Sequence, residues 1–292
     1  MSAREPDGSL SFVHPAVHRT AVVLLHGLCS TPDELSSVQS ALRQHGYAVD
    51  ALPIEGYSFD AARPLQQAAP WTQWLATIEA RVDALRALHD KVLLVGISAG
   101  SALALGAAIR CGERVDALVL MSTALCFDGW AVPRTQALLP LALYTPLGRF
   151  WRYRERAPYG VKNERVRAWI ARELRSRQIS RAGSAVIGID HLREHDRLLR
   201  HVRRHLGQVR CAQVLALHAR EDEVASVANL ELLARGLGCG TFRSVVLGNS
   251  YHMITIDNDR HQVLRETLAF ADAVAHGTAP LLPLPRLQES FA

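Results

Sequence analysis

The sequence has little that would place the protein in a membrane, an oxidising compartment or a class of metalloproteins. No apolar run in the 292 residues reaches the ~18–20 residues that a membrane-spanning helix needs. The opening residues, MSAREPDGSLSF, contain no apolar stretch like that of a signal peptide, so we expect none. The five cysteines are odd in number, scattered and without a C-x-x-C pair. They predict neither a disulfide framework nor a zinc site, and they favour a reducing, cytoplasmic location.

Lysine is almost absent, so arginine carries nearly all of the positive charge behind the formal net charge of +5. Residues 149–204 contain sixteen Arg or Lys side chains against six acidic ones. This basic segment has three interpretations: a solvated helix surface, recognition of an anionic acyl donor such as coenzyme A or an acidic acyl carrier protein, and contact with a membrane surface. No nucleic-acid-binding motif accompanies the arginines, so we expect no nucleic acid partner.

The most informative stretch is Lys91–Arg110, KVLLVGISAGSALALGAAIR. A short apolar run, typical of a strand buried on both faces, leads into the pentad Gly96-Ile97-Ser98-Ala99-Gly100, and small apolar residues typical of a buried helix follow. The pentad alone would occur by chance in roughly a tenth of chains of this length. Its position between a strand and a helix predicts a nucleophile elbow, with Ser98 at the mouth of the helix N-terminus. Glycine suits positions 96 and 100 because a Cβ atom there would collide with neighbouring backbone.

The order of the other expected elements predicts an α/β fold with a mostly parallel sheet and helices on both faces. The expected strands are 20–25, 47–54, 92–95, 115–120, 213–217 and 241–247, and the expected helices are 32–44, 71–89, 102–109, 227–236 and 257–275. At the first helix, Thr31 is a good N-cap, Pro32 suits the first helical position and Glu34 follows three residues after the cap.

Residues 126–206 interrupt this pattern. They are irregular over 126–160, where four prolines fall, and helical over 162–177 and 191–206. We interpret 126–206 as a helical cap inserted into a single domain that spans residues 1–292. The Pro-rich segment 277–292 is expected to be a loosely held tail.

Two polar residues follow the last two predicted strands, at the edge of the sheet where the elbow also ends. Asp222 follows strand 213–217, and His252 follows strand 241–247. Acyl transfer by a serine needs a base to take its proton and an acid to orient that base. The order serine, acid, histidine along the chain is that of an α/β-hydrolase. Glu221 and Glu223 flank Asp222 and remain alternative acids, while His26 is expected to orient a loop and not to act as a base.

With these residues identified, the chain resembles the α/β-hydrolases, and among them the small carboxylesterases and monoacylglycerol lipases. The resemblance rests on four segments: VVLLHGLCSTPDEL, the elbow 96–101, the acid segment 222–225 and the final segment 250–257, SYHMITID. It implies that Ser98 is the nucleophile, His252 the base and Asp222 the acid, with the backbone N–H groups of Leu28 and Ala99 as the oxyanion hole. Two segments depart from the family pattern: Ala99 is smaller than the residue that the family usually has after the serine, and Glu55-Gly56-Tyr57 replaces the family's usual Pro-Gly-His-Gly loop. The resemblance therefore does not identify the substrate.

We therefore expect a serine hydrolase that cleaves small acyl esters through an acyl-enzyme on Ser98, with no metal or cofactor. Its rate should rise with pH through a group near ~6.5–7, the ordinary range of a histidine. An alternative is a thioesterase or acyltransferase that acts on acyl groups bound to coenzyme A or a carrier protein. A third hypothesis is a hydrolase-fold binding protein without catalytic activity.

Overall fold

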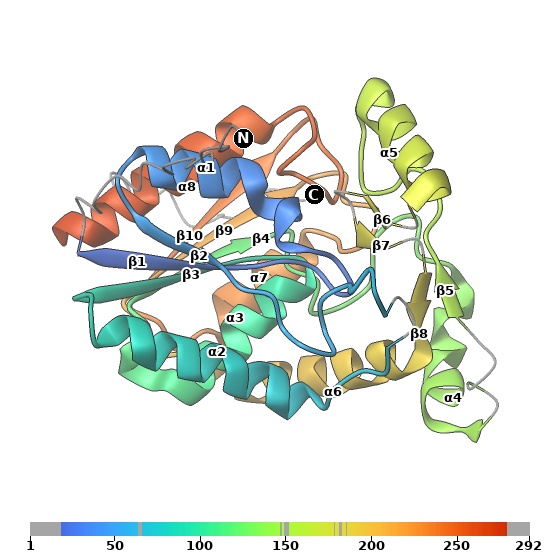
Figure 1. Ribbon diagram of the computed structural model, residues 1–292, viewed down its shortest axis with the longest axis horizontal. Helices are drawn as coiled ribbons and strands as arrows, with labels where there is room; N and C mark the ends of the chain where they lie inside the picture. The colour runs from blue at the N-terminus through green and yellow to red at the C-terminus, as the bar shows by residue number, and fades with distance from the viewer. Residues whose placement is uncertain are drawn as a thin grey trace, which may run out of the picture.

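A computed structural model describes residues 19–63, 66–146, 148, 152–177, 179–180, 183–184 and 186–278. Six strands form one sheet in the order β10-β9-β4-β3-β1-β2, and every pair of neighbours is parallel (Figure 1). The strands are β1 (Thr20–Leu25), β2 (Ala48–Ala51), β3 (Lys91–Ile97), β4 (Ala117–Met121), β9 (Gln213–Ala219) and β10 (Thr241–Leu247). The predicted parallel α/β sheet is confirmed, and the predicted tail lies outside the described residues beyond position 278.

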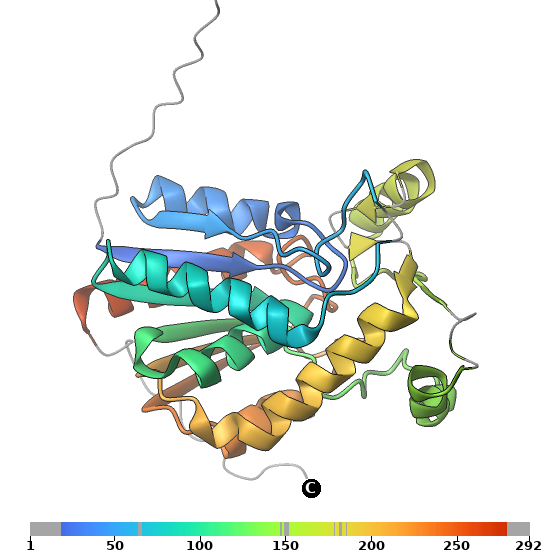
Figure 2. The same ribbon diagram turned by 60° about the horizontal axis from the view of Figure 1, so that its bottom comes forward.

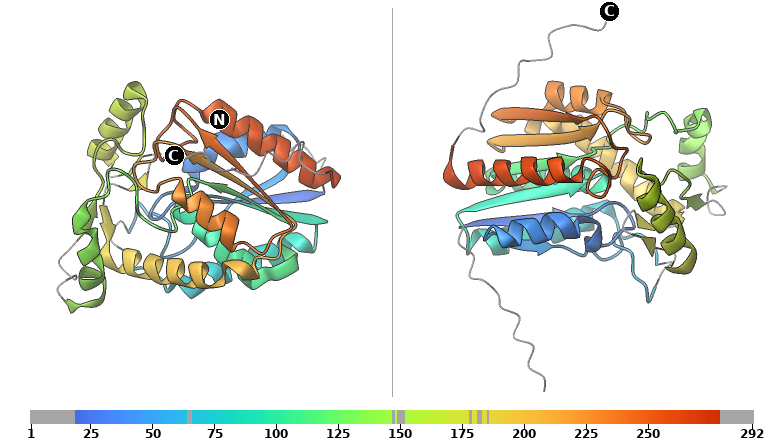
Figure 3. Two further views of the ribbon diagram at one scale, coloured as in Figure 1. Left: turned by 180° about the vertical axis from the view of Figure 1, so that it is seen from behind. Right: turned by 90° about the horizontal axis from the view of Figure 1, so that it is seen from above.

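Helices cover both faces of the sheet, which explains why its central strands are apolar without alternation. One face carries α1 and α8, and the other carries α2, α3, α7 and much of α6 (Figures 1 and 3). Their bounds are α1 (Ser36–Gln44), α2 (Trp71–Arg86), α3 (Ala99–Cys111), α6 (Ile189–His205), α7 (Ala228–Gly236) and α8 (Arg260–His276).

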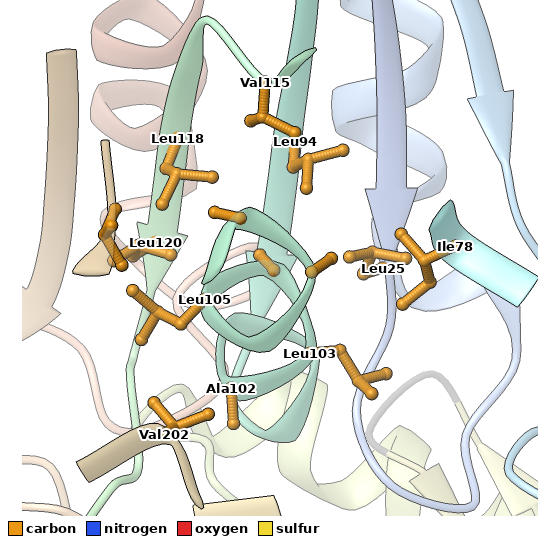
Figure 4. Packing of buried hydrophobic residues seen from close by; sticks show 14 of the residues in the cluster. Leu25, Ile78, Leu94, Ala102, Leu103, Leu105, Val115, Leu118, Leu120 and Val202 are labelled. Atoms are coloured by element: carbon orange, nitrogen blue, oxygen red, sulfur yellow. The ribbon is translucent and has the colours of Figure 1, made fainter. Parts of the chain in front are cut away.

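Helix α3 lies at the centre of the core and directly follows Ser98. Its small residues let it lie close to the sheet, while Leu103 and Leu105 reach toward side chains of other elements (Figure 4). A Cβ atom on Gly106 would lie 3.1 Å from Leu75 of α2 and 3.2 Å from Leu198 of α6. This dense packing fixes the helix that begins at the elbow, and so fixes the N–H groups at its start.

Several boundaries differ from those predicted. The first helix begins with a 3-10 turn at Pro32–Leu35, and the Thr31 side chain makes no capping hydrogen bond. Strand β2 stops at Ala51 because the Ile54 N–H donates to Ser58 Oγ in a turn instead of to a neighbouring strand. Helix α2 ends at Arg86 because the chain turns back, and the Asp90 N–H donates to the carbonyl of Arg19.

The region predicted as irregular, 126–160, contains a helix, α4 (Leu139–Tyr144), and a short strand, β5 (Arg152–Arg154). Strand β5 pairs antiparallel with β8 (Val186–Gly188), and β6 (Ile179–Ser180) pairs with β7 (Gly183–Ser184). The two ribbons, α4 and α5 (Glu164–Arg177) lie beyond the carboxyl ends of the sheet strands (Figures 1 and 2).

Helix α6 connects this outer layer to the core. It starts next to β8 and runs back along α2 and α3 beneath the sheet (Figure 2). Its residues Leu198, Leu199 and Val202 are buried in the same cluster as α3. The cap over residues 126–206 stays a prediction, and the end of α6 packs as part of the core. Within the described ranges, no helix has both the length and the apolar character that crossing a membrane requires.

Candidate active site

The chain makes a sharp turn at Ser98, between β3 and α3. Ser98 has φ 54° and ψ −119°, a backbone conformation that residues other than glycine rarely adopt. A Cβ atom on Gly96 would lie 2.3 Å from the carbonyl oxygen of Gly100, and one on Gly100 would lie 2.0 Å from that of Leu25. Both positions therefore require glycine, as predicted, and the turn presents Ser98 at the carboxyl end of β3.

The structure brings Ser98, His252 and Asp222 together. His252 Nε2 lies 2.8 Å from Ser98 Oγ, and its Nδ1 lies 2.8 Å from Asp222 Oδ2. Asp222 is 2% exposed and His252 is 6% exposed, whereas Ser98 is partly accessible. Since a carboxylate can only accept, the neutral form of the ring carries its proton on Nδ1 toward Asp222, and in this form Nε2 can accept the proton of Ser98. This arrangement can activate a serine hydroxyl.

The two residues beside Asp222 have other partners. Glu221 is exposed and pairs with Lys162 at 2.7 Å. Glu223 is buried, and its Oε2 accepts the backbone N–H of His252 at 3.1 Å. Asp222 itself accepts the N–H groups of Val224 and Ala225, both at 2.9 Å, so its orientation is fixed. Of the three acids, only Asp222 is bonded to the His252 ring.

The loop that carries His252 is anchored at several points. Ser122 Oγ donates to the His252 carbonyl at 2.6 Å. The buried carboxylate of Asp257 accepts the N–H groups of Tyr251, Lys162 and Asn163 at 2.7–2.9 Å. Asp257 thus joins this loop to the segment that leads into α5. It also explains why α8 begins at Arg260 and not at the predicted position 257.

The charges around His252 favour its protonated form. Burial alone would lower its pKa, but Asp222, followed by Glu223 and Glu34, outweighs burial and raises the pKa of His252 to about 9. Burial opposes ionisation of Asp222, yet contact with His252 keeps the pKa of this carboxyl below its usual value. The pair is thus suited to form and hold an imidazolium ion when the serine loses its proton.

The second side of the site is the loop after β1, which carries Leu28. His26 does not face Ser98, because its Nε2 lies 2.7 Å from Ser58 Oγ and its Nδ1 lies 2.8 Å from the Gly27 carbonyl. Burial lowers the pKa of His26 to about 4, so the ring is neutral near pH 7. His26 therefore orients the loop, as the sequence predicted. Ala99 is the first residue of α3, where backbone N–H groups have no partner within the helix.

Three buried or partly buried carboxyls near His252 were not predicted as site residues: Glu34, Glu155 and Glu223. Burial raises the pKa of Glu34 to about 7. Burial, together with the charge of Glu223, raises that of Glu155 to about 7 as well. Glu223 was considered only as a rival to Asp222, and Glu34 only as a helix-capping residue. Each of them has a charged neighbour along the sequence, and the partners that bury them come from distant parts of the chain, so the sequence carried no clear signal.

Across the described part of the chain, no group of three or more His, Cys, Asp or Glu side chains is placed to hold a metal ion. All five cysteines are free thiols.

The sheet order, the strained serine turn and the Ser98–His252–Asp222 contacts define an α/β-hydrolase. Residues 16–259 match the family described as serine aminopeptidase, S33, and the chain belongs to this family.

Several lipolytic enzymes are similar to the chain. A thermostable monoacylglycerol lipase from Bacillus sp. (strain H-257) is 22% identical over 249 residues, which cover 85% of this chain and 89% of the lipase. A solved structure of the metagenome-derived lipolytic enzymes LipS and LipT is 23% identical, with a TM-score of 0.71 and coverage of 88% and 95%. The monoacylglycerol lipase of Paleococcus ferrophilus is 16% identical, with a TM-score of 0.72 and coverage of 90% and 97%.

Proposed function

We propose that the protein is a carboxylester hydrolase that forms an acyl-enzyme on Ser98. The observation that carries this proposal is the continuous chain of hydrogen bonds from Ser98 through His252 to Asp222, with both links at 2.8 Å. Similarity to monoacylglycerol lipases supports an ester substrate with a small alcohol. The free cysteines favour a reducing, cytoplasmic location.

In the first step, His252 Nε2 takes the proton of Ser98 while the Ser98 oxygen attacks the ester carbonyl. The carbonyl oxygen becomes negative, and the N–H groups of Leu28 and Ala99 stabilise it. Asp222 stabilises the imidazolium ion that forms, without taking its proton. His252 then gives the proton to the leaving alcohol, which departs and leaves the acyl group on Ser98.

In the second step, a water molecule replaces the alcohol. His252 takes a proton from this water as its oxygen attacks the acyl-enzyme. The same two N–H groups stabilise the second tetrahedral intermediate. Return of the proton to Ser98 Oγ releases the carboxylic acid and restores the starting state, so the net reaction is ester plus water to acid plus alcohol.

The proposal is tested by labelling with a fluorophosphonate, which reacts with activated serines. We expect a single modified residue, Ser98, when the labelled protein is digested and analysed by mass spectrometry. Ser98→Ala should abolish labelling and lower kcat by about 10⁴–10⁶-fold while leaving the circular dichroism spectrum unchanged. Activity of Ser98→Ala within tenfold of the parent would contradict the proposal, and absence of labelling in the parent would favour a binding protein.

The substrate class needs a separate comparison, because the family description names an aminopeptidase whereas the similar proteins above are lipolytic. We expect hydrolysis of p-nitrophenyl esters and monoacylglycerols, and little turnover of aminoacyl p-nitroanilides. A kcat/KM for the anilides equal to that for the esters would move the assignment to peptide hydrolysis.

The thioester alternative depends on the basic segment 149–204. Several of its arginines already have partners within the protein: Arg197 pairs with Glu194, Arg200 pairs with Asp196 at 2.9 Å, and Arg203 donates to the Leu125 carbonyl at 2.6 Å. These contacts favour a structural use of the charge over recognition of coenzyme A. The alternative predicts that acyl-CoA is a better substrate than the matching p-nitrophenyl ester, and that added salt weakens its binding.

A further inference from the structure

Glu34 has a different partner from the one its sequence position predicts. It lies three residues after Thr31, as a capping residue would, but the structure turns its side chain toward the loop after β1. Glu34 is 3% exposed, and its Oε2 accepts the backbone N–H of Gly27 at 2.6 Å. A Cβ atom on Gly27 would lie 3.2 Å from each of the two carboxylate oxygens. The carboxylate therefore packs closely against Gly27, and a side chain at position 27 would have to displace it.

This contact fixes the peptide group that contains the Leu28 N–H. The Gly27 carbonyl accepts from His26 Nδ1 at 2.8 Å and from the Ser30 N–H at 3.2 Å, while Glu34 holds the Gly27 N–H. In a trans peptide the carbonyl and the following N–H point in opposite directions. Fixing the Gly27 carbonyl therefore fixes the direction of the Leu28 N–H. That N–H has no acceptor among the residues that the structure describes.

A neutral acceptor would be enough to satisfy the Gly27 N–H. The presence of a buried carboxylate at this position therefore needs a further explanation. A bond from an N–H to a carboxylate is shorter and stronger than one to a neutral oxygen. Glu34 also lies close enough to His252 for its charge to favour the imidazolium form. The titratable groups that face Glu34 are His252 and Tyr57, and burial raises the pKa of Tyr57 well above its usual value, so Tyr57 stays neutral.

We propose that Glu34 is a positioning residue that aims the Leu28 N–H at the substrate oxyanion by fixing the Gly27–Leu28 peptide. This role rests on the ester hydrolysis proposed above. The role depends on the hydrogen bond from the Gly27 N–H to Glu34, and the charge of Glu34 adds only a smaller contribution that favours the imidazolium form of His252.

The kinetic experiment compares Glu34→Leu, which removes both the acceptor and the charge, with Glu34→Gln, which keeps an acceptor. Loss of one oxyanion donor costs about 10²–10³-fold in kcat, so a misaligned donor in Glu34→Leu should cost about 10–100-fold in kcat with little change in KM. Glu34→Gln should recover most of that loss. Asp33→Asn is the matched control, because Asp33 is exposed on the same turn, and its kinetics should equal those of the parent.

A spectroscopic readout separates positioning from general stability and does not require turnover. In protein labelled with ¹⁵N-glycine, the Gly27 amide resonance should titrate with a midpoint near 7, the pKa of Glu34. This step should vanish in Glu34→Gln, whereas any step caused by His252 near pH 9 should remain. This measurement stays decisive if Glu34→Leu does not fold.

The outcomes distinguish this inference from the proposed function. An inactive, unlabelled parent protein would overturn ester hydrolysis, while the Gly27 titration would still test the contact. An active parent with Glu34→Leu within about twofold of it in kcat would overturn the positioning role. An equal loss in Glu34→Leu and Asp33→Asn, or a Gly27 resonance that titrates unchanged in Glu34→Gln, would overturn it as well.

Discussion

The two sides of the site are held in place by different means. Ser98 and Asp222 follow β3 and β9, two strands of the sheet that both pair with β4, and His252 follows β10 on a loop that Ser122 and Asp257 anchor. The loop that carries Leu28 depends instead on buried polar side chains. His26, Ser58 and Glu34 hold it through bonds of 2.6–2.8 Å. On the triad side, the sheet therefore supports Ser98 and Asp222 directly, whereas on the oxyanion side the loop of Leu28 depends on a few buried polar side chains.

This difference has an energetic consequence. A strand end is fixed by many backbone bonds and apolar contacts, so losing one side chain leaves it in place. A loop held by a few buried polar groups loses much of its order when one of them is removed, because the remaining partner is left unsatisfied. We therefore expect substitutions on the triad side to change the chemistry without changing the structure, and substitutions on the oxyanion side to change both.

Among the substitutions that compare the two sides, Asp222→Asn should have the largest effect. The amide cannot stabilise the imidazolium ion and disturbs the tautomer of His252, so kcat should fall by about 10⁴-fold with the melting temperature nearly unchanged. Glu223→Gln is the matched control, since it keeps an acceptor for the His252 N–H and should cost less than about tenfold. Steady-state kinetics and thermal unfolding of both variants test this. A greater loss in Glu223→Gln would make Glu223 the acid.

The carboxylates around His252 should also determine how kcat/KM of the parent enzyme depends on pH. The base must be neutral to act, and the surrounding carboxylates raise the pKa of His252 to about 9. Activity is therefore lost as pH falls through that value, and kcat/KM should rise by about tenfold per unit above pH 7 until it levels near 9. The sequence alone predicted the ordinary range of about 6.5–7. A profile that is level above pH 7 would show that the carboxylates do not control this histidine.

The triad residues could be predicted from the sequence, whereas the contacts of the oxyanion loop could not. Ser98 was predictable because the strand, the pentad and the helix are contiguous. Asp222 and His252 were predictable because each follows a strand, and parallel strands bring their carboxyl ends to one edge. The roles of these residues remain proposals, but the structure places all three in contact.

The contacts of Glu34 could not be predicted in this way. The same spacing from Thr31 is compatible with a capping bond or with the bond to Gly27, and the path of the loop decides between them. That path depends on residues elsewhere: Tyr57 donates its hydroxyl to the His26 carbonyl at 2.8 Å and accepts the Cys29 N–H at 3.2 Å through its own carbonyl. The ribbons β5–β8 and β6–β7 were missed for another reason, since strands of two or three residues are too short to show a period.

The third prediction concerns the point where the two sides touch. A Cβ atom on Gly100 would lie 2.0 Å from the Leu25 carbonyl oxygen and 2.6 Å from that of His26. Gly100→Ala should therefore push the elbow away from the oxyanion loop, with a loss of about 3 kcal/mol in the free energy of unfolding. Gly248→Ala is the control, because nothing lies within 4 Å of its Cβ position, and it should change stability by less than about 0.5 kcal/mol. Urea unfolding of both variants measures the difference.

Ser58→Ala should have the smallest effect on kcat, and a smaller effect on the free energy of unfolding than Gly100→Ala. It is also the substitution most specific to the oxyanion side. Ser58 Oγ bonds to His26 Nε2 at 2.7 Å and accepts the Ile54 N–H at 2.8 Å. Removing it leaves two buried groups unsatisfied and should cost about 1–3 kcal/mol in the free energy of unfolding. Because His26 then no longer holds the Gly27 carbonyl firmly, kcat should fall as well, by less than in Glu34→Leu.

The control for Ser58→Ala is Thr77→Ala, in which an exposed hydroxyl that bonds only within its own helix is lost. It should leave both stability and kcat close to those of the parent. Loss of stability in Ser58→Ala with an unchanged kcat would mean that the loop keeps its shape without His26. In that case Glu34 and the Ser30 N–H would hold the Gly27–Leu28 peptide without His26, and the order of the oxyanion loop would depend on Glu34 more than on His26.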